Sequence, residues 1–153
     1  FNTIESSPTR NLHGMPVAIL CGHTLPTVRG DTPALSPDQF AYLGVRDVDR
    51  LERARMRAHG MRELSVGAVD GWLRRVDRVH VSLDVDSVFD AALSVNTPVP
   101  DGIPLGALLE VLRLARRSGK LVCVDVVEFN PTVGDAARTA ALVEAMIVAV
   151  TDG

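Results

Sequence analysis

Two aspartates, two residues apart, form the most chemically suggestive pair in the chain. Asp84 and Asp86 come at the end of the apolar segment 78–84, which has the pattern of a strand buried on both faces. In a strand, side chains two positions apart project from the same face, so we expect the two carboxylates to lie together. They would repel each other unless a cation lies between them, and a divalent metal, or a pair of metals, is the natural candidate. The alternative is an aspartate pair that caps the turn after the strand.

Acidic residues also follow the two other predicted strands. Asp47 and Asp49 follow the first of these strands, and Glu128 follows the last. The carboxyl ends of parallel strands meet at the edge of the sheet where ligands bind, so we expect all these acids to converge there. Such convergence indicates a cationic ligand, a metal, or both. For Glu128, a half-buried carboxylate that needs a partner, the alternative is a salt bridge to one of the arginines.

The elements that must position these acids alternate along the chain. Segments 40–45, 78–84 and 121–127 are apolar runs bounded by polar residues and are predicted strands. Alternation of strands and helices is typical of an α/β domain with a mostly parallel sheet between helical layers. One short predicted helix begins at Pro16, and the other predicted helices cover residues 50–59, 65–76, 104–117 and 136–150. Residues 61–64 are predicted to form a short strand. The predicted loops are residues 1–12, 24–38 and 87–103.

The composition excludes several classes of protein. The length of 153 residues suits one domain, and the net charge of -3 gives no reason to expect binding to nucleic acid or to an anionic membrane. No apolar run reaches the roughly 20 residues of a membrane span. Two cysteines without a motif favour a reducing compartment, so we expect a cytoplasmic protein. The chain starts at Phe1 rather than at methionine, which favours a piece of a longer protein.

Four short blocks of the sequence stand out: residues 11–16, 46–49, 82–86 and 127–131. They resemble consecutive blocks of the arginase (ureohydrolase) family. They come in the family's order with similar spacing, and the resemblance covers essentially the whole chain. The first two favour arginase over agmatinase or formiminoglutamase. The resemblance implies a three-layer αβα, arginase/deacetylase-like fold, with residues 1–153 as the C-terminal part of a single catalytic domain whose N-terminal part is missing.

The resemblance also implies an activity for the intact protein. Family members use two manganese ions to hydrolyse a guanidino carbon–nitrogen bond, and arginase converts L-arginine into L-ornithine and urea. Arginases assemble as trimers or hexamers, so we expect a homo-oligomer. Two alternatives stay open: a related ureohydrolase, such as an agmatinase or formiminoglutamase, or a non-catalytic arginase-like subunit or binding module.

Site residues carry over from the family's blocks. Asp84 and Asp86 match manganese ligands, His13 matches a histidine implicated in proton transfer, and Glu128 matches the carboxylate that pairs with the guanidinium. The residues that match the substrate-binding shell are Asn2, Thr9, Asn11, Asp49, Glu52 and Thr97.

The chain also departs from the family. The two family blocks that supply the remaining metal ligands, both metal-binding histidines among them, are missing, so we expect the 153-residue chain alone to be inactive. Arg10 stands where glycine is usual.

Overall fold

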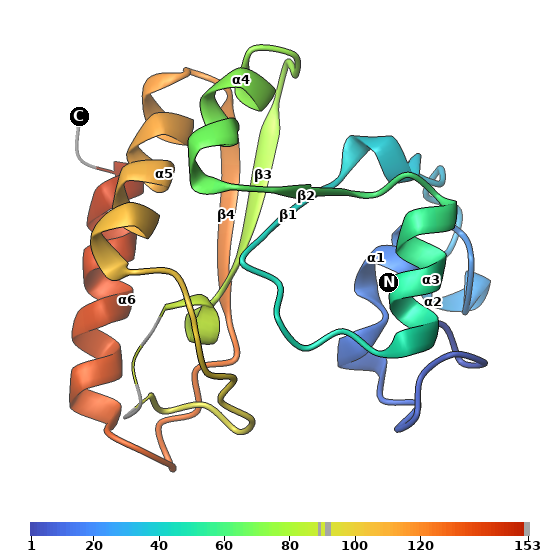
Figure 1. Cartoon of the computed structure of the whole chain (residues 1–153), viewed down its shortest axis with the longest axis horizontal. Helices are drawn as coiled ribbons and strands as arrows, with labels where there is room; N and C mark the ends of the chain where they lie inside the picture. The colour runs from blue at the N-terminus through green and yellow to red at the C-terminus, as the bar shows by residue number, and fades with distance from the viewer. Residues whose placement is uncertain (89, 91–92, 152–153) are drawn as a thin grey trace. The chain divides into compact units, whose positions relative to one another are not determined.

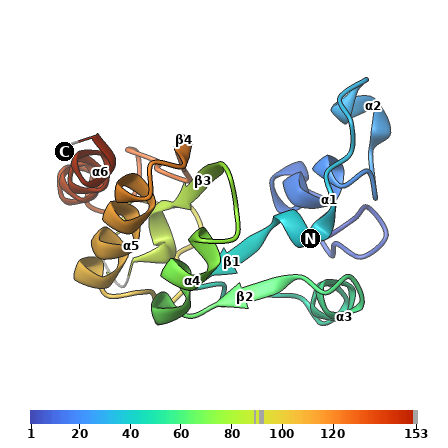
Figure 2. The ribbon, with the colours of Figure 1, turned by 90° about the horizontal axis from the view of Figure 1, so that it is seen from above.

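The computed structural model describes residues 1–88, 90 and 93–151 (Figures 1 and 2). The chain divides into two compact units, Phe1–Glu63 and Leu64–Gly153. In the described residues the strands form two separate sheets, β1–β2 and β3–β4. Strand β1, which precedes Asp47 and Asp49, is not paired with β3 or β4 among the described residues, so the expectation that these two acids share a sheet edge with the others stays a prediction.

The first unit is built from short elements around a small core. Proline occupies the first turn of α1, as predicted, and also the first turns of α2 and η2, which break up the predicted loop 24–38. The core joins Phe1, Ala18, Cys21 and Met56, so the N-terminal segment, α1 and α3 pack together. The elements are η1 (Leu12–Gly14), α1 (Pro16–Leu20), α2 (Pro26–Arg29), η2 (Pro37–Gln39), β1 (Ala41–Leu43), α3 (Arg50–Ala58) and β2 (Arg62–Leu64), whose last residue begins the second unit.

The second unit contains the strand pair that carries the central aspartates. Strands β3 and β4 are parallel, with Ser82 opposite Asp125 and Asp84 opposite Val127. Helices α5 and α6 lie side by side along one face of this pair, as both views show. The elements are η3 (Val66–Ala68), α4 (Val69–Leu73), β3 (Val79–Asp84), η4 (Val85–Ser87), α5 (Leu105–Arg117), β4 (Leu121–Val127) and α6 (Ala136–Thr151).

Strand β3 is covered on one face only, which corrects the prediction of a strand buried on both. Val79 and Leu83 are buried, whereas His80 and Ser82 between them are exposed. The alternation Val-His-Val-Ser-Leu was present in the sequence and is typical of a strand with two different faces.

Local signals set most helix ends correctly. The Asp135 carboxylate accepts a hydrogen bond from the Arg138 N–H at 3.0 Å and so caps α6, as predicted. Gly60, with φ of 64°, follows the end of α3 as predicted. Two predictions were wrong in detail: the Ser65 side chain makes no capping bond, and Pro104 precedes α5 as its N-cap rather than opening it. No helix in the described part of the chain is both long and apolar enough to cross a membrane.

Candidate metal and substrate site

Asp84 and Asp86 lie together, but through a turn rather than through strand geometry. Asp84 is the last residue of β3, and its carboxylate caps η4 by accepting the Asp86 N–H at 3.0 Å. The Asp86 carboxylate accepts the Val99 N–H at 3.1 Å, which ties it to the loop before α5. The two readings of the Asp-x-Asp pair are thus not exclusive, because the same aspartates cap the turn and remain close.

The surroundings of Asp84 raise its pKa from 3.8 to about 6. Burial is the main cause, and the negative charges of Asp86 and Glu128 add to it, while the hydrogen bond from the Asp86 backbone acts in the opposite direction. The strand register places Asp84 opposite Val127, so Asp84, Asp86 and Glu128 lie at the same end of the strand pair. The predicted convergence of acids is confirmed for the ends of β3 and β4.

Glu128 has an unusual backbone at the end of β4. Its φ is 70°, in the left-handed region that glycine adopts readily and glutamate does not. A non-glycine residue held in this region costs on the order of 1 kcal/mol or more and commonly marks a functional position.

The loop that carries Thr97 is joined to the segment after β4. Thr97 itself is exposed, but its neighbour Asn96 accepts a hydrogen bond through Oδ1 from Asn130 Nδ2 at 2.7 Å. Asn130 lies two residues after Glu128. The structure thus places the predicted residues Thr97 and Glu128 on two segments that contact each other.

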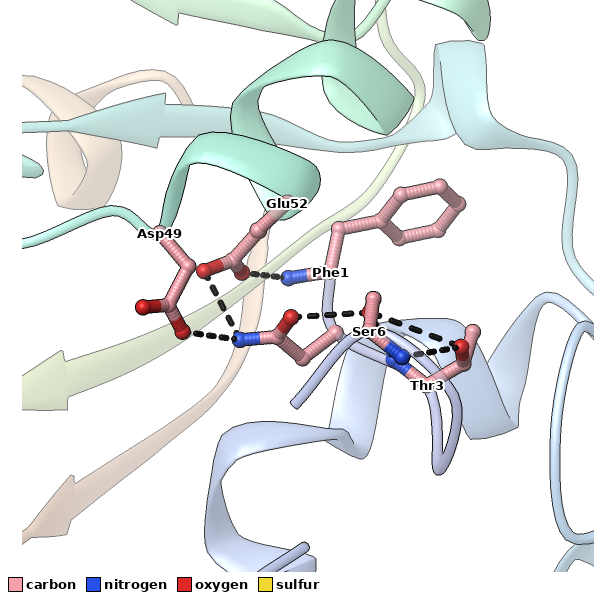
Figure 3. Close-up of polar contacts among 6 residues, drawn as sticks. Phe1, Thr3, Ser6, Asp49 and Glu52 are labelled. Atoms are coloured by element: carbon pink, nitrogen blue, oxygen red, sulfur yellow. Dashed lines mark hydrogen bonds and ion pairs between the residues drawn. The ribbon is translucent and has the colours of Figure 1, made fainter. Parts of the chain in front are cut away.

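In the first unit, three predicted substrate-shell residues form one cluster (Figure 3). Asn2 Nδ2 donates to Asp49 Oδ2 at 3.0 Å and to Glu52 Oε2 at 3.1 Å. The Phe1 nitrogen also contacts Glu52, and Ser6 Oγ donates to Asn2 Oδ1 at 2.9 Å. Asp49 precedes α3 and Glu52 lies in its first turn, so one helix terminus presents both carboxylates. This arrangement suits an ammonium group as ligand.

The other three predicted residues of this unit lie on one exposed stretch. The Asn11 N–H donates to Thr9 Oγ1 at 3.3 Å, and His13 lies within the 3-10 turn η1. Between Thr9 and Asn11, Arg10 has φ of 58°. Arginine therefore occupies a left-handed conformation at the position where glycine is usual in the family.

Sequence reasoning missed two polar networks of the second unit. On the exposed face of β3–β4, Asp125 accepts the Ser82 hydroxyl at 2.6 Å and pairs with His80. In the segments that follow β3 and β4, the hydroxyl of the fully buried Ser94 donates a hydrogen bond to the Asn130 carbonyl. The alternating polar residues of β3 signalled the first network; nothing local in the sequence signals the second.

The metal that the resemblance implies fits these residues in part. Asp84 and Asp86 supply hard oxygen donors, which suit Mn²⁺, and their mutual repulsion favours a cation between them. In residues 1–88, 90 and 93–151, however, no group of three or more histidine, cysteine, aspartate or glutamate side chains is arranged to hold a metal ion. Two carboxylates are an incomplete ligand set.

A parallel strand pair that presents carboxylates at its carboxyl end and is covered by helices is typical of α/β proteins that bind ligands at that edge. The chain belongs to the arginase family, whose sequence pattern it matches over residues 1–151. It is 30% identical to the arginase of Bacillus subtilis over 146 residues, covering 85% of this chain and 49% of that protein. The chain spans about half the length of the curated relatives it matches.

Solved structures agree with this assignment and confirm the predicted fold class. The Entamoeba histolytica arginase, determined in complex with L-ornithine, superposes with a TM-score of 0.90 at 26% identity, covering 99% of this chain and 56% of that one. The proclavaminate amidino hydrolase of Streptomyces clavuligerus is more distant, with a TM-score of 0.58 at 26% identity over 76% of this chain and 43% of that one.

Proposed function

We propose that the protein containing this chain is a manganese-dependent arginase that hydrolyses L-arginine to L-ornithine and urea. The observation that carries this proposal is the group of three carboxylates, Asp84, Asp86 and Glu128, at the ends of β3 and β4 in a member of the arginase family. Such a group suits both a divalent cation and a guanidinium ion.

Within this proposal each residue has a separate task. Asp84 and Asp86 would hold manganese together with ligands from outside the described residues. Bound manganese would make water a nucleophile near neutral pH. Glu128 pairs with the substrate guanidinium and orients its carbon, and His13 transfers a proton to the leaving amine.

The substrate-binding residues divide by charge. Asp49 and Glu52, bridged by Asn2, suit the α-ammonium group of the substrate. Thr9 and Asn11 supply a hydroxyl and an amide for its carboxylate. Thr97 lies beside the guanidinium end. The proposal has three further parts. Residues 1–153 are the C-terminal part of a single catalytic domain. The intact protein is a homo-oligomer, a trimer or hexamer, and it is cytoplasmic.

The test is urea release from L-arginine by the full-length protein with and without Mn²⁺. Manganese-dependent urea production supports the proposal, and a protein that stays inactive at all manganese concentrations refutes it. Substitution of Glu128 by glutamine should abolish most of the activity, because the guanidinium then loses its charged partner.

A second candidate is a related amidinohydrolase with another guanidino substrate. The likeness to the proclavaminate amidino hydrolase and the arginine at position 10 both favour testing it. The measurement is a comparison of kcat/KM for L-arginine, agmatine, formiminoglutamate and larger guanidino acids. A preference of more than about tenfold, equivalent to roughly 1.4 kcal/mol, for any substrate other than L-arginine would select this candidate.

A third candidate is a non-catalytic arginase-like subunit. The incomplete metal-ligand set in the described part of the chain is the observation behind it. Calorimetric titration of the full-length protein with Mn²⁺ separates the cases, because an enzyme must bind two ions tightly whereas a non-catalytic subunit need bind none.

A further inference from the structure

The segments that follow β3 and β4 lie at the same end of the strand pair (Figure 1). Ser94 joins the two segments through its side-chain hydroxyl and its main-chain carbonyl. Its Oγ donates to the Asn130 carbonyl at 2.8 Å and contacts the Val133 carbonyl, and its own carbonyl accepts the Asn130 N–H at 2.8 Å. Ser94 is fully buried, so these bonds are shielded from water.

The anchor of this connection is the start of α6. The Ser94 N–H donates to Thr139 Oγ1 at 2.9 Å, and that hydroxyl donates to the Asp135 carbonyl at 2.9 Å. Thr139 is fully buried as well. Gly134 completes the fit: a Cβ atom at this position would lie 2.4 Å from the Leu93 carbonyl oxygen. The two segments are therefore packed backbone to backbone.

Asn130 uses every polar group that it has within this network. Its N–H and carbonyl bind Ser94, and its Nδ2 donates to Asn96 Oδ1 at 2.7 Å. Its Oδ1 accepts the Thr132 N–H at 3.0 Å and the Thr132 hydroxyl at 2.7 Å. No rotation of the Asn130 backbone or side chain is possible without breaking a hydrogen bond.

This residue lies two positions after the left-handed Glu128, and its partner Asn96 directly precedes Thr97. A glutamate leaves the left-handed region unless the chain on both sides holds it there. Before Glu128 the chain is held by the β3–β4 pairing, which reaches Val127. After Glu128, two hydrogen bonds to Ser94 hold the backbone of Asn130.

We infer that Asn130 is a positioning residue, which clamps Glu128 in its left-handed conformation and sets it at a fixed distance from Thr97 for binding the guanidinium group. This inference rests on the proposed function for the guanidinium partner, whereas the clamp itself does not depend on any activity. Asn130 acts through Glu128 and does not contact the substrate.

The first test measures hydrolysis by the full-length protein carrying Asn130→Ala, Asn96→Ala or the matched Asn96→Asp. Asn130→Ala should lower kcat by about tenfold to a hundredfold, because small displacements of a substrate-orienting group have effects of this size. Asn96→Ala should lower it less, and Asn96→Asp, which keeps the acceptor oxygen for Asn130 Nδ2, should restore it. Asn96→Ala removes only a bond between exposed atoms, so it serves if Asn130→Ala does not fold.

Non-additivity separates positioning from a general structural effect. In a double-mutant cycle, Asn130→Ala should add little to the loss of kcat caused by Glu128→Gln. The reason is that Glu128→Gln already removes the carboxylate that Asn130 orients. Additive losses, or an unchanged kcat in both alanine variants, would overturn the inference.

The second test needs no activity and so distinguishes failure of the clamp from failure of the proposed function. At ordinary positions glycine is less stable than alanine, but at a left-handed position the order reverses. Glu128→Gly should therefore melt a few degrees above Glu128→Ala in full-length protein with Asn130 intact. The difference should shrink in the Asn130→Ala background, which loses the side-chain bonds to Asn96 and Thr132 but keeps the backbone bonds to Ser94. A difference that persists there undiminished would refute the clamp.

Discussion

Asp84 lowers the stability of the metal-free protein when it is ionised. Its pKa is raised from 3.8 to about 6 by burial and by the charges of Asp86 and Glu128. In the unfolded chain the carboxyl loses its proton near pH 4, whereas in the folded protein it keeps the proton until about pH 6. Between these values the folded state binds more protons than the unfolded state, so the free energy of unfolding falls as the pH rises.

The size of this effect follows from the shift. A displacement from 3.8 to about 6 corresponds to about 3 kcal/mol, which is an upper limit. Asp84 is only half-buried, and solvent screening reduces the expected contribution to about 1–2 kcal/mol. Asp84→Asn removes the charge and keeps an oxygen that can accept the Asp86 N–H. We therefore expect the variant to be more stable than wild type by about 1–2 kcal/mol at pH 7.5.

The assay is urea denaturation of the full-length protein in a metal chelator at several pH values from 4 to 7.5. The gain in the free energy of unfolding of Asp84→Asn over wild type should be small at pH 4. Most of its increase should occur between pH 4 and about pH 6. Asp77→Asn, at an exposed aspartate before β3, is the matched control and should show no such trend. A gain that does not change with pH, or a loss at neutral pH, would refute the electrostatic reasoning. Manganese should reverse the order of stability, because it binds the wild-type carboxylates and not the amide.

Three further predictions concern other described residues. Arg10→Gly should raise the free energy of unfolding by about 0.5–1 kcal/mol, because φ of 58° at this position lies in the left-handed region that glycine tolerates. Arg113→Gly, on the exposed side of α5, is the control and should lower the free energy of unfolding by about 1 kcal/mol. Denaturant titration measures both variants. Ser82→Ala should raise the pKa of Asp125, because the Ser82 hydroxyl, and to a smaller extent His80, hold that pKa below its usual value. NMR titration of the Asp125 carboxyl carbon measures the change, and an unchanged pKa would contradict the prediction. The 153-residue chain alone should release no urea from L-arginine with Mn²⁺, because Asp84 and Asp86 are an incomplete ligand set; measurable turnover would contradict this.

Several helix ends were predictable from the sequence because their signals are local, whereas α2 and η2 lie in a segment that was predicted to be a loop. Pro16, Gly60 and Asp135 act within one turn of their own position, through a fixed φ, a left-handed conformation and a capping carboxylate. The strand β4 was likewise predictable from its apolar run. The exposed face of β3 was predictable too, because His80 and Ser82 alternate with apolar residues, and here the pattern was interpreted wrongly.

The candidate site was predictable in its residue types but not in its geometry. The period of a strand predicted that Asp84 and Asp86 lie together, and they do, although Asp86 lies in a 3-10 turn and a capping bond brings them together. The conformation of Glu128 could not be predicted, because glutamate has no preference for φ of 70°.

Distant contacts explain this difference between chemistry and geometry. The bond that fixes Asn130 comes from Ser94, 36 residues earlier, and the bond that fixes Ser94 comes from Thr139, 45 residues later. A single sequence gives each of these residues only a weak turn or helix preference. The carboxylates at the strand ends repel one another, so the local capping bond between Asp84 and Asp86 and contacts from the rest of the fold must hold them together in the absence of a cation. A site of this kind is therefore recognisable from its charged residues, while the residues that hold it are found only in the folded chain.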